Sequence, residues 1–225
     1  MNPKLRTMFA SLALIFAGSS HADTLITFEE AATGLTAMVN SFTLVPTGSR
    51  LSNQYLSSNG VSFSSLAGYV ALVNHAYPTA SFPNIIGGTA ANGQLSYNAP
   101  ITISFFDTAN TSVKAVTSSF KIQGDWYPLG WGSVFATAYG VAGNVLGSTS
   151  DTDNKVYGVS GPVLEFNNIA GIHSVVISGD NGTVGFDNLQ YGVLTAVPEP
   201  GTYALMLAGL GLVGALARRR KASQQ

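Results

Sequence analysis

The segment Ile101-Thr102-Ile103-Ser104-Phe105 alternates apolar and hydroxyl side chains without a break. Successive side chains of a β-strand point to opposite faces, so this alternation predicts a strand with one buried and one solvent-facing side. The pairs Phe120/Ile122 and Phe135/Thr137 repeat the pattern further along the chain. A sheet that buries only one face needs a second layer against it, and a second sheet is the simplest one.

The sequence around this segment is typical of an all-β domain. Residues 23–195 are rich in Ser, Thr, Gly, Asn, Val and aromatic residues, and no stretch keeps a helical period. Gly143-Asn144 and Asp180-Asn181-Gly182 predict hairpin turns. Residues 30–59 and 74–99 lose the periodicity and predict long loops. We predict an antiparallel β-sandwich with strands at residues 25–28, 60–65, 69–73, 101–106, 113–123, 134–141, 163–166, 172–178 and 183–191.

Composition limits the classes of function. The chain has 225 residues, 46% of them hydrophobic, 9% charged and none of them cysteine, which excludes disulfides and thiolate metal sites. Between residues 23 and 197 four basic and ten acidic side chains give a formal charge of −6. A domain with so few cations cannot neutralise phosphates, so we expect no nucleic-acid partner.

The N-terminus has the organisation of a secretory signal peptide. Lys4 and Arg6 precede an apolar run over residues 8–17, and small residues lead to a predicted cut between Ala22 and Asp23. A short buried helix is the alternative, but the basic flank and the small-residue site favour export. We therefore assign residues 1–22 to the signal peptide and residues 23–195 to the ectodomain.

The C-terminus combines a chain breaker, an apolar segment and a cationic stop. The breaker is Val197-Pro198-Glu199-Pro200-Gly201, whose prolines keep the peptide extended. Residues 202–217 are uncharged and apolar, which predicts a single transmembrane helix at the short end of the usual range. The cluster that follows should stay cytoplasmic by the positive-inside rule, and consists of Arg218, Arg219, Arg220 and Lys221.

This order of elements over residues 197–221 resembles the PEP-CTERM sorting signal of exosortase substrates. The resemblance implies export by the general secretion machinery, temporary insertion in the inner membrane, and cleavage by an exosortase near Pro198, Glu199 and Pro200. It also implies a final place at the cell surface or in an extracellular polysaccharide matrix or biofilm. A membrane anchor that is never cut is the alternative. We assign residues 196–221 to this signal.

Three phrases of the ectodomain resemble the jelly-roll domains found among proteins with such tails: residues 25–30, 55–63 and 184–189. A jelly roll pairs its first and last strands, which would bring Glu29 or Glu30 near Asp187. Carbohydrate-binding modules of this shape often hold structural calcium between such carboxylates, and calcium takes oxygen ligands. The alternative is that Asp187 and Asn188 bond to nearby backbone while the glutamates are solvated.

A second acidic stretch, Asp151-Thr152-Asp153-Asn154, carries the first oxygens of a calcium loop. Lys155 stands where a ligand should follow, and no twelfth-position glutamate completes the loop. We therefore predict a solvated acidic turn here.

Both tryptophans lie in one Gly/Pro-containing loop, Gly124 to Gly132. Aromatic faces beside a carboxylate can grip the C–H surface and the hydroxyls of a sugar. The alternative is that the tryptophans close the end of the sandwich. The predicted polysaccharide contacts are Asp125, Trp126, Tyr127 and Trp131.

No catalytic motif stands out, and we predict that the protein is not an enzyme. His75 and His173 lack metal-spaced partners, and no nucleophile elbow or phosphate loop is present. A polysaccharide hydrolase using carboxylates such as Asp125 and Glu165 is one alternative function. A structural coat or biofilm protein without a glycan ligand is another.

Overall fold

The structure, a computed structural model, describes residues 23–29, 34–39, 41–74, 83–126, 132–153, 161–180, 184–198, 201 and 205–213. The predicted signal peptide therefore lies outside the described residues, as do Glu30, Tyr127, Trp131, Glu199, Pro200 and the basic cluster 218–221.

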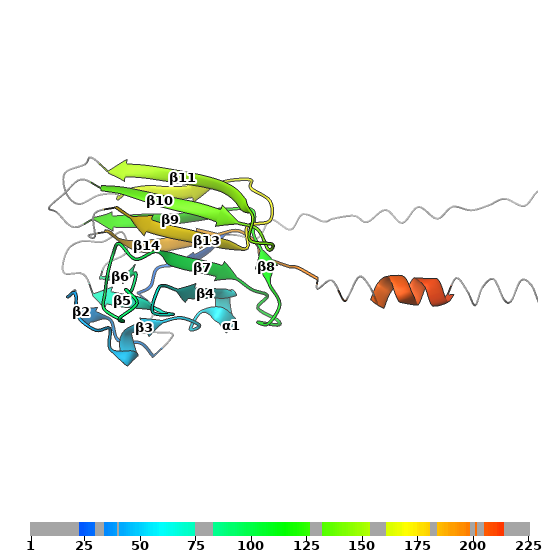
Figure 1. Ribbon diagram of the computed structural model, residues 1–225, viewed down its shortest axis with the longest axis horizontal. Coiled ribbons are helices and arrows are strands. Elements are labelled where there is room, and N and C mark those ends of the chain that lie inside the picture. The colour runs from blue at the N-terminus through cyan, green and yellow to red at the C-terminus, as the bar shows by residue number, and fades with distance from the viewer. Residues whose placement is uncertain are drawn as a thin grey trace, which may run out of the picture.

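The larger sheet has eight strands, and its main path runs β12-β9-β14-β6-β5-β2 (Figure 1). β1 pairs with β14, and β3 pairs with β5. Every pairing is antiparallel except that of β2 with β5. The strands are β1 (Thr24–Ile26), β2 (Met38–Val39), β3 (Arg50–Leu51), β5 (Val70–Asn74), β6 (Asn84–Gly87), β9 (Phe120–Trp126), β12 (Val163–Phe166) and β14 (Val184–Tyr191).

The second sheet has five antiparallel strands in the order β11-β10-β13-β7-β4. They are β4 (Val61–Ser64), β7 (Ile101–Phe105), β10 (Gly132–Tyr139), β11 (Val145–Asp153) and β13 (Ser174–Gly179). A two-stranded sheet joins β8 (Ala115–Val116) to β15 (Thr195–Ala196). The short helices are η1 (Thr47–Ser49) and α1 (Leu56–Asn59).

The main core lies between the two large sheets, which makes the domain sandwich-like. Strand β10 shows how the sequence produces this layer, because Val134, Ala136 and Ala138 are buried while Phe135 on the other face is 42% exposed. Leu164 and Phe166 of β12, in the opposite sheet, belong to the same buried cluster. The alternation that predicted half-buried strands therefore also defines the interior of the domain.

A second, smaller core covers the outer face of the larger sheet at β5 and β6. Ala71 and Val73 of β5 and Ile85 of β6 are buried there beneath Leu95 and Tyr97. Strand β5 is consequently buried on both faces from Val70 to Val73, which explains its continuous apolar run.

Several predicted strands differ from the observed ones. The prediction of one strand over residues 113–123 is wrong, because β8 and β9 are separate and Thr117 forms a bridge with Ile172 between them. Strand β6 lies in a region predicted as loop, and most of β11 was not predicted. Asp151 and Asp153 belong to β11, so the predicted solvated turn at these residues is also wrong.

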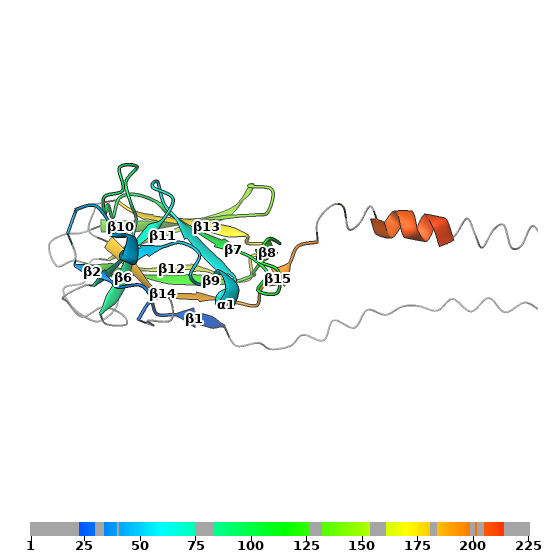
Figure 2. The same cartoon turned by 90° about the horizontal axis from the view of Figure 1, so that it is seen from below.

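The chain leaves the sandwich from one end. Strand β15 lies at the end of the domain that carries β8, and the helical residues 205–213 lie beyond that end in two perpendicular views (Figures 1 and 2). Beyond β15, Gly201 and residues 205–213 are helical. Among the described residues no helix is both long and apolar enough to cross a membrane.

Candidate functional site

The centre of β14 is a junction between three other strands. β9 lies along one edge of β14, whereas β1 and β6 share the other edge. Ile26 of β1 pairs with Leu189, and Ile86 of β6 pairs with Phe186. The end of β1 and the start of β6 therefore meet beside Asp187 and Asn188.

The backbone is irregular at this junction. The β14–β9 register shifts between Asp187 and Gln190, which marks a β-bulge or similar irregularity. Asn188 has φ of 50° and Phe28, beside Glu29, has φ of 60°. Positive φ is uncommon for residues other than glycine, and such geometry tends to persist where the surrounding contacts enforce it.

Glu29 is held at this junction by β6. Its Oε1 accepts a hydrogen bond from the backbone N–H of Asn84 at 2.6 Å, and Asn84 Nδ2 donates to Phe28 O at 3.4 Å. Partial burial raises the pKa of the Glu29 carboxyl, the Asn84 hydrogen bond opposes that rise, and the charge of Asp187 adds to it. The structure thus places Glu29 within electrostatic reach of Asp187.

Asp187 is completely buried, and its Oδ1 accepts a hydrogen bond from Asn188 N at 2.7 Å. The local backbone contact considered as the alternative is therefore present, together with the proximity to Glu29. A buried carboxylate beside a second carboxylate is electrostatically unfavourable unless a proton, a hydrogen bond or a cation compensates the charge.

Asn84 is a residue of this junction that the sequence did not reveal. Its Oδ1 is buried and accepts no hydrogen bond from the described part of the chain. Buried acceptors without a donor are rare, and an ion or a water is a common reason for one. Asn84 lay within residues predicted as loop, and an asparagine directly before Ile85-Ile86 was the available signal.

These oxygen atoms suit a hard cation such as calcium. Two carboxylates and an amide oxygen are hard ligands, and calcium takes six to eight of these. No group of three or more His, Cys, Asp or Glu side chains that could hold a metal occurs among the described residues. Any cation at the junction would therefore use the Asn84 amide beside Glu29 and Asp187.

The predicted sugar-binding loop is only partly described. Asp125 and Trp126 are the last residues of β9, and their backbones pair with Gly185 and Val184 of β14. Tyr127 and Trp131 lie outside the described residues. The strand preceding this loop is thus fixed to the centre of the larger sheet.

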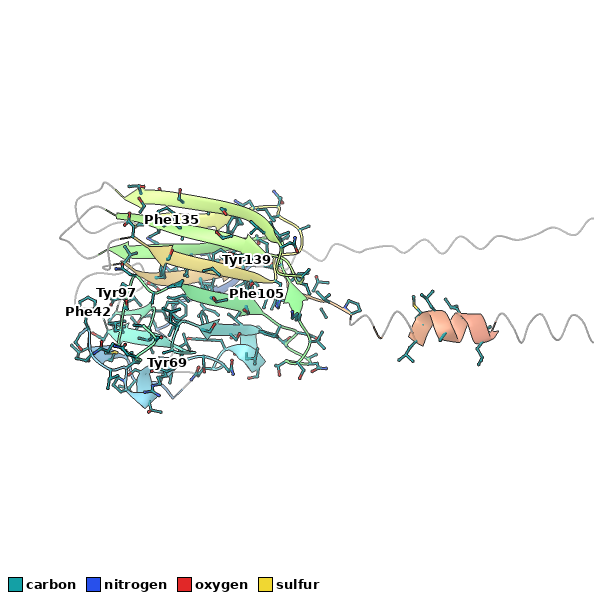
Figure 3. The ribbon with its side chains drawn as sticks, in the orientation of Figure 1. Phe42, Tyr69, Tyr97, Phe105, Phe135 and Tyr139 are labelled. Carbon is teal, nitrogen blue, oxygen red and sulfur yellow. The ribbon has the colours of Figure 1, made fainter. Side chains whose placement is uncertain are left out.

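A broad polar face lies on the outer side of the five-stranded sheet (Figure 3). Phe135 and Tyr139 of β10 project there, and Phe135 pairs with Ser178 of β13 and Ser150 of β11. Val176 pairs with Thr137 on the same face. We call this surface the hydroxyl face, after its partly or fully exposed residues Ser62, Ser64, Thr102, Ser104, Ser133, Thr137, Ser148, Ser150, Thr152, Ser174 and Ser178.

None of these positions is charged, and the carboxylate of Asp180 lies at the edge of the hydroxyl face, where it accepts the backbone N–H of Ser133 at 2.9 Å. Asp151 of β11 is directed the other way, because its Oδ2 accepts the backbone N–H of Val163 in β12 at 2.8 Å. Two pairs of hydroxyls bond to each other across strands, Ser133 with Thr152 at 2.9 Å and Thr137 with Ser148 at 3.1 Å. The face therefore offers donors and acceptors around two aromatic rings.

The other titratable groups singled out in the sequence lie at separate places in the described part of the fold. His173 is 8% exposed, and its Nδ1–H donates to Ala115 O at 3.0 Å, while its ring packs edge-on against Phe106. The backbone of Glu165 in β12 lies opposite that of Lys121 in β9, and Asp125 lies four residues further along β9. That spacing separates the two backbones by about 13 Å along the sheet.

The fold and these sites define a β-sandwich ectodomain followed by a C-terminal sorting tail. The chain carries the PEP-CTERM protein-sorting motif at residues 196–221, where it matches the family model of that description. The match confirms the resemblance seen in the sequence, and it covers the tail only.

No curated protein matches the chain. Among solved structures, a DUF4465 family protein from Bacteroides caccae has 14% sequence identity and a TM-score of 0.37, covering 82% of this chain and 97% of its own. The enzymatically active domain of tailspike protein 4 from bacteriophage CBA120 has 15% identity and a TM-score of 0.34, covering 69% of this chain and 22% of its own.

Proposed function

We propose that this protein is exported, held in the inner membrane by residues 202–217, and then cleaved by an exosortase to become a cell-surface or matrix protein. The observation that carries the proposal is the PEP-CTERM motif at residues 196–221. In this proposal residues 1–22 are the signal peptide, and residues 23–195 are the ectodomain with a jelly-roll-like fold. Pairing of the first strand, β1, with β14 supports that fold.

The described helical residues of the tail support membrane insertion. Leu205, Leu207 and Leu212 are 76%, 65% and 68% exposed. A run of large apolar side chains that are mostly exposed is costly in water and favourable in lipid. The cationic cluster 218–221 would then hold the C-terminus on the cytoplasmic side.

Mass spectrometry of the mature protein tests the proposal. We expect a C-terminus near Pro198–Pro200 in cells that contain an exosortase, and an intact Gln225 in cells that lack it. Replacing Pro198 and Pro200 by alanine should leave the tail uncut. An intact Gln225 in the exosortase-containing cells would leave only a permanent membrane anchor.

We further propose that the ectodomain binds a neutral extracellular polysaccharide. The supporting observation is the hydroxyl face, where the rings of Phe135 and Tyr139 lie among hydroxyl groups and the charge of Asp180 is confined to the edge. Sugar rings expose C–H faces that pack on aromatic rings and hydroxyls that need both donors and acceptors. The loop from Trp126 to Trp131, between β9 and β10, is a second candidate for sugar contact.

Binding of the ectodomain to neutral polysaccharides, compared between variants, tests this second proposal. Phe135→Ala should weaken binding by about tenfold if the ring stacks on sugar. Phe42→Ala is the matched control, because Phe42 is 62% exposed and lies against Tyr97, away from the hydroxyl face (Figure 3). Trp126→Ala tests the loop separately. Equal binding by all three variants and the wild type would mean that the polysaccharide binds elsewhere, and no binding by the wild type would favour a structural coat protein.

A structural calcium at the β14 junction is part of the same proposal for the ectodomain. Glu29, Asp187 and Asn84 would supply oxygen ligands, and the bound charge would relieve the repulsion between the two carboxylates. Glu30 is a further candidate ligand from the sequence. The melting temperature should fall with a chelator and recover with calcium but not magnesium, and an unchanged value would remove the site.

The proposal assigns no reaction to the ectodomain. A polysaccharide hydrolase remains the alternative from the enzyme class, and it needs two accessible carboxylates across a cleft. Complete burial of Asp187 argues against the Glu29–Asp187 pair in that role. Release of reducing ends from the bound polysaccharide would establish the enzyme instead.

A further inference from the structure

The last strand of the domain runs directly into the sorting motif. Thr195 and Ala196 of β15 pair with Val116 and Ala115 of β8, and Val197 N donates to Lys114 O at 2.8 Å. The matched motif begins at Ala196, so its first residues are hydrogen-bonded to the folded ectodomain. Pro198 is the next residue and is exposed.

Strand β8 is firmly attached to the sandwich. Thr117 exchanges two backbone hydrogen bonds with Ile172, and the Ala115 carbonyl accepts from His173 Nδ1. Ala115 itself is fully buried. Strand β8 is therefore held in place by the sandwich, and β15 pairs with its outer edge.

Strand β15, in contrast, is weakly held. It has two residues, and both are exposed. Elements with few buried contacts and solvent-exposed hydrogen bonds open at the low end of the free-energy scale. Residues 195–197 can therefore detach while the rest of the sandwich stays folded.

Attachment of β15 conflicts with access to the motif. A processing enzyme takes its substrate as extended backbone whose hydrogen-bonding groups are free to pair with the enzyme. Val197 is the last such residue before Pro198, and its N–H is already bonded to Lys114 O. Only three residues separate Val197 from the helical Gly201, at most about 14 Å of chain. The folded end of the domain therefore lies close to any enzyme acting at Pro198–Pro200.

We propose that β15 is a releasable strap that controls cleavage: exosortase engages the motif only when residues 195–197 have left β8. This inference rests on the proposed processing of the tail. It assigns the ectodomain a regulatory part in its own sorting, because the stability of the β8–β15 pair sets the fraction of molecules open to cleavage. Loss of one strap hydrogen bond should raise that fraction by about fivefold.

A disulfide lock tests the strap in the full chain, produced in cells that contain an exosortase. The pair Thr195→Cys and Val116→Cys lies at directly opposed positions, which suits a disulfide, and the chain has no other cysteine. Cleavage of the oxidised double variant should be at least tenfold slower than that of either single variant. Reduction of isolated membranes should restore it.

A linker gives the matched rescue. Four residues, Gly-Ser-Gly-Ser, inserted between Val197 and Pro198 of the locked variant move the motif away from β8 and should restore cleavage without reduction. Equal cleavage of the locked and single variants, or a locked variant that the linker does not rescue, would overturn the strap. If the wild type itself keeps Gln225 in these cells, the proposed processing fails instead.

Discussion

At the scale of single residues, Tyr191 joins the two layers of the sandwich. It belongs to β14, its ring packs on Phe105 of β7 at 5.1 Å between centroids, and its hydroxyl donates to Asn59 O at 2.7 Å. The side chain is 2% exposed, and burial raises the pKa of Tyr191 to about 12, against the hydrogen bonds with Thr24 and Asn59. The folded protein therefore favours the protonated, neutral form of the Tyr191 hydroxyl.

Tyr191→Phe should lower the free energy of unfolding by about 1 kcal/mol at neutral pH, because the ring packing stays while Asn59 O loses its donor. For a domain of this size the loss corresponds to about 2–4 °C in Tm. Thermal unfolding followed by circular dichroism measures it. An unchanged Tm would mean that water replaces the phenol at Asn59 O without cost.

The same substitution has a signature at alkaline pH. A raised pKa in the folded state means that the stabilisation is complete below the unfolded value of about 10 and is lost as pH rises towards 12. Wild type should therefore lose more stability than Tyr191→Phe between pH 10 and 12. Urea unfolding of both proteins across that range tests this, and parallel curves would contradict it. The other tyrosines titrate in both proteins and cancel in the difference.

Glu29 resembles Tyr191 in that burial makes its ionised form the costly one. Its raised pKa means that stability from this group is full below the unfolded pKa of about 4.3 and falls as pH rises through the folded value. Without calcium, Glu29→Gln should raise Tm at pH 7 by no more than about 3 °C. The amide oxygen of the substituted side chain can still accept from Asn84 N.

With calcium the order of the two proteins should reverse, because only the wild type retains both carboxylates of the proposed site. Differential scanning calorimetry of each protein with and without calcium gives the comparison. Calcium stabilisation of the same size in Glu29→Gln and wild type would exclude Glu29 as a ligand.

At the scale of elements, Gly60 is the position where backbone geometry and packing coincide. It ends α1 with φ of 68°, and a Cβ there would lie 2.3 Å from Phe106 O. Gly143 in the β10–β11 turn also has positive φ, 80°, but no atom lies within 4 Å of its Cβ position. Alanine substitutions at the two glycines therefore distinguish the free-energy cost of positive φ from the cost of a steric clash with neighbouring atoms.

Gly143→Ala should therefore cost about 1 kcal/mol, the conformational penalty alone. Gly60→Ala adds displacement of the Phe106 carbonyl, whose position β7 helps to determine, and should cost about 3 kcal/mol or more. Chemical denaturation of the two variants provides the measurement. Equal losses would show that the α1–β4 connection shifts freely away from Phe106.

Elements were predictable from sequence where one face of a strand is buried. β7 and β10 were predicted because polar and apolar side chains alternate along them. β6 was not, because Ile85 and Ile86 are both buried, one in each core, so Asn84–Gly87 has no period. β11 escaped prediction because Ser148, Ser150 and Thr152 face solvent while Gly147, Thr149 and Asp151 are only partly buried.

At the scale of the whole molecule, the function of the C-terminal tail was easier to predict from sequence than the site in the ectodomain. The tail motif is local, since breaker, apolar segment and basic cluster follow one another in sequence. The junction at Asp187 is not local: it needs Glu29, Asn84 and Asp187 from three separate segments, and only the topology brings them together. The resemblance to jelly rolls suggested the pairing of first and last strands, but nothing in the sequence located Asn84.

The positions of the chain ends also orient the molecule before cleavage. In the proposed membrane-anchored state, the tail leaves from β15, so we expect the end of the domain with β8 to lie next to the membrane (Figures 1 and 2). Asn92 belongs to the exposed turn whose neighbour Gln94 forms a bridge with Leu44, near Phe42 and Tyr97 at the opposite end (Figure 3). Ser112, also exposed, lies in the turn that precedes β8.

In membranes without exosortase, Asn92→Cys should react with a bulky, membrane-impermeant maleimide several times faster than Ser112→Cys, because the bilayer and the tethered tail crowd the β8 end. The matched control is the same pair after detergent release, where the two thiols should react at similar rates. A similar ratio of rates in membranes and in detergent would mean that the ectodomain tumbles freely on its tether. Since the strap holds Val197 on β8 and only three residues separate it from Gly201, that free rotation should require β15 to open.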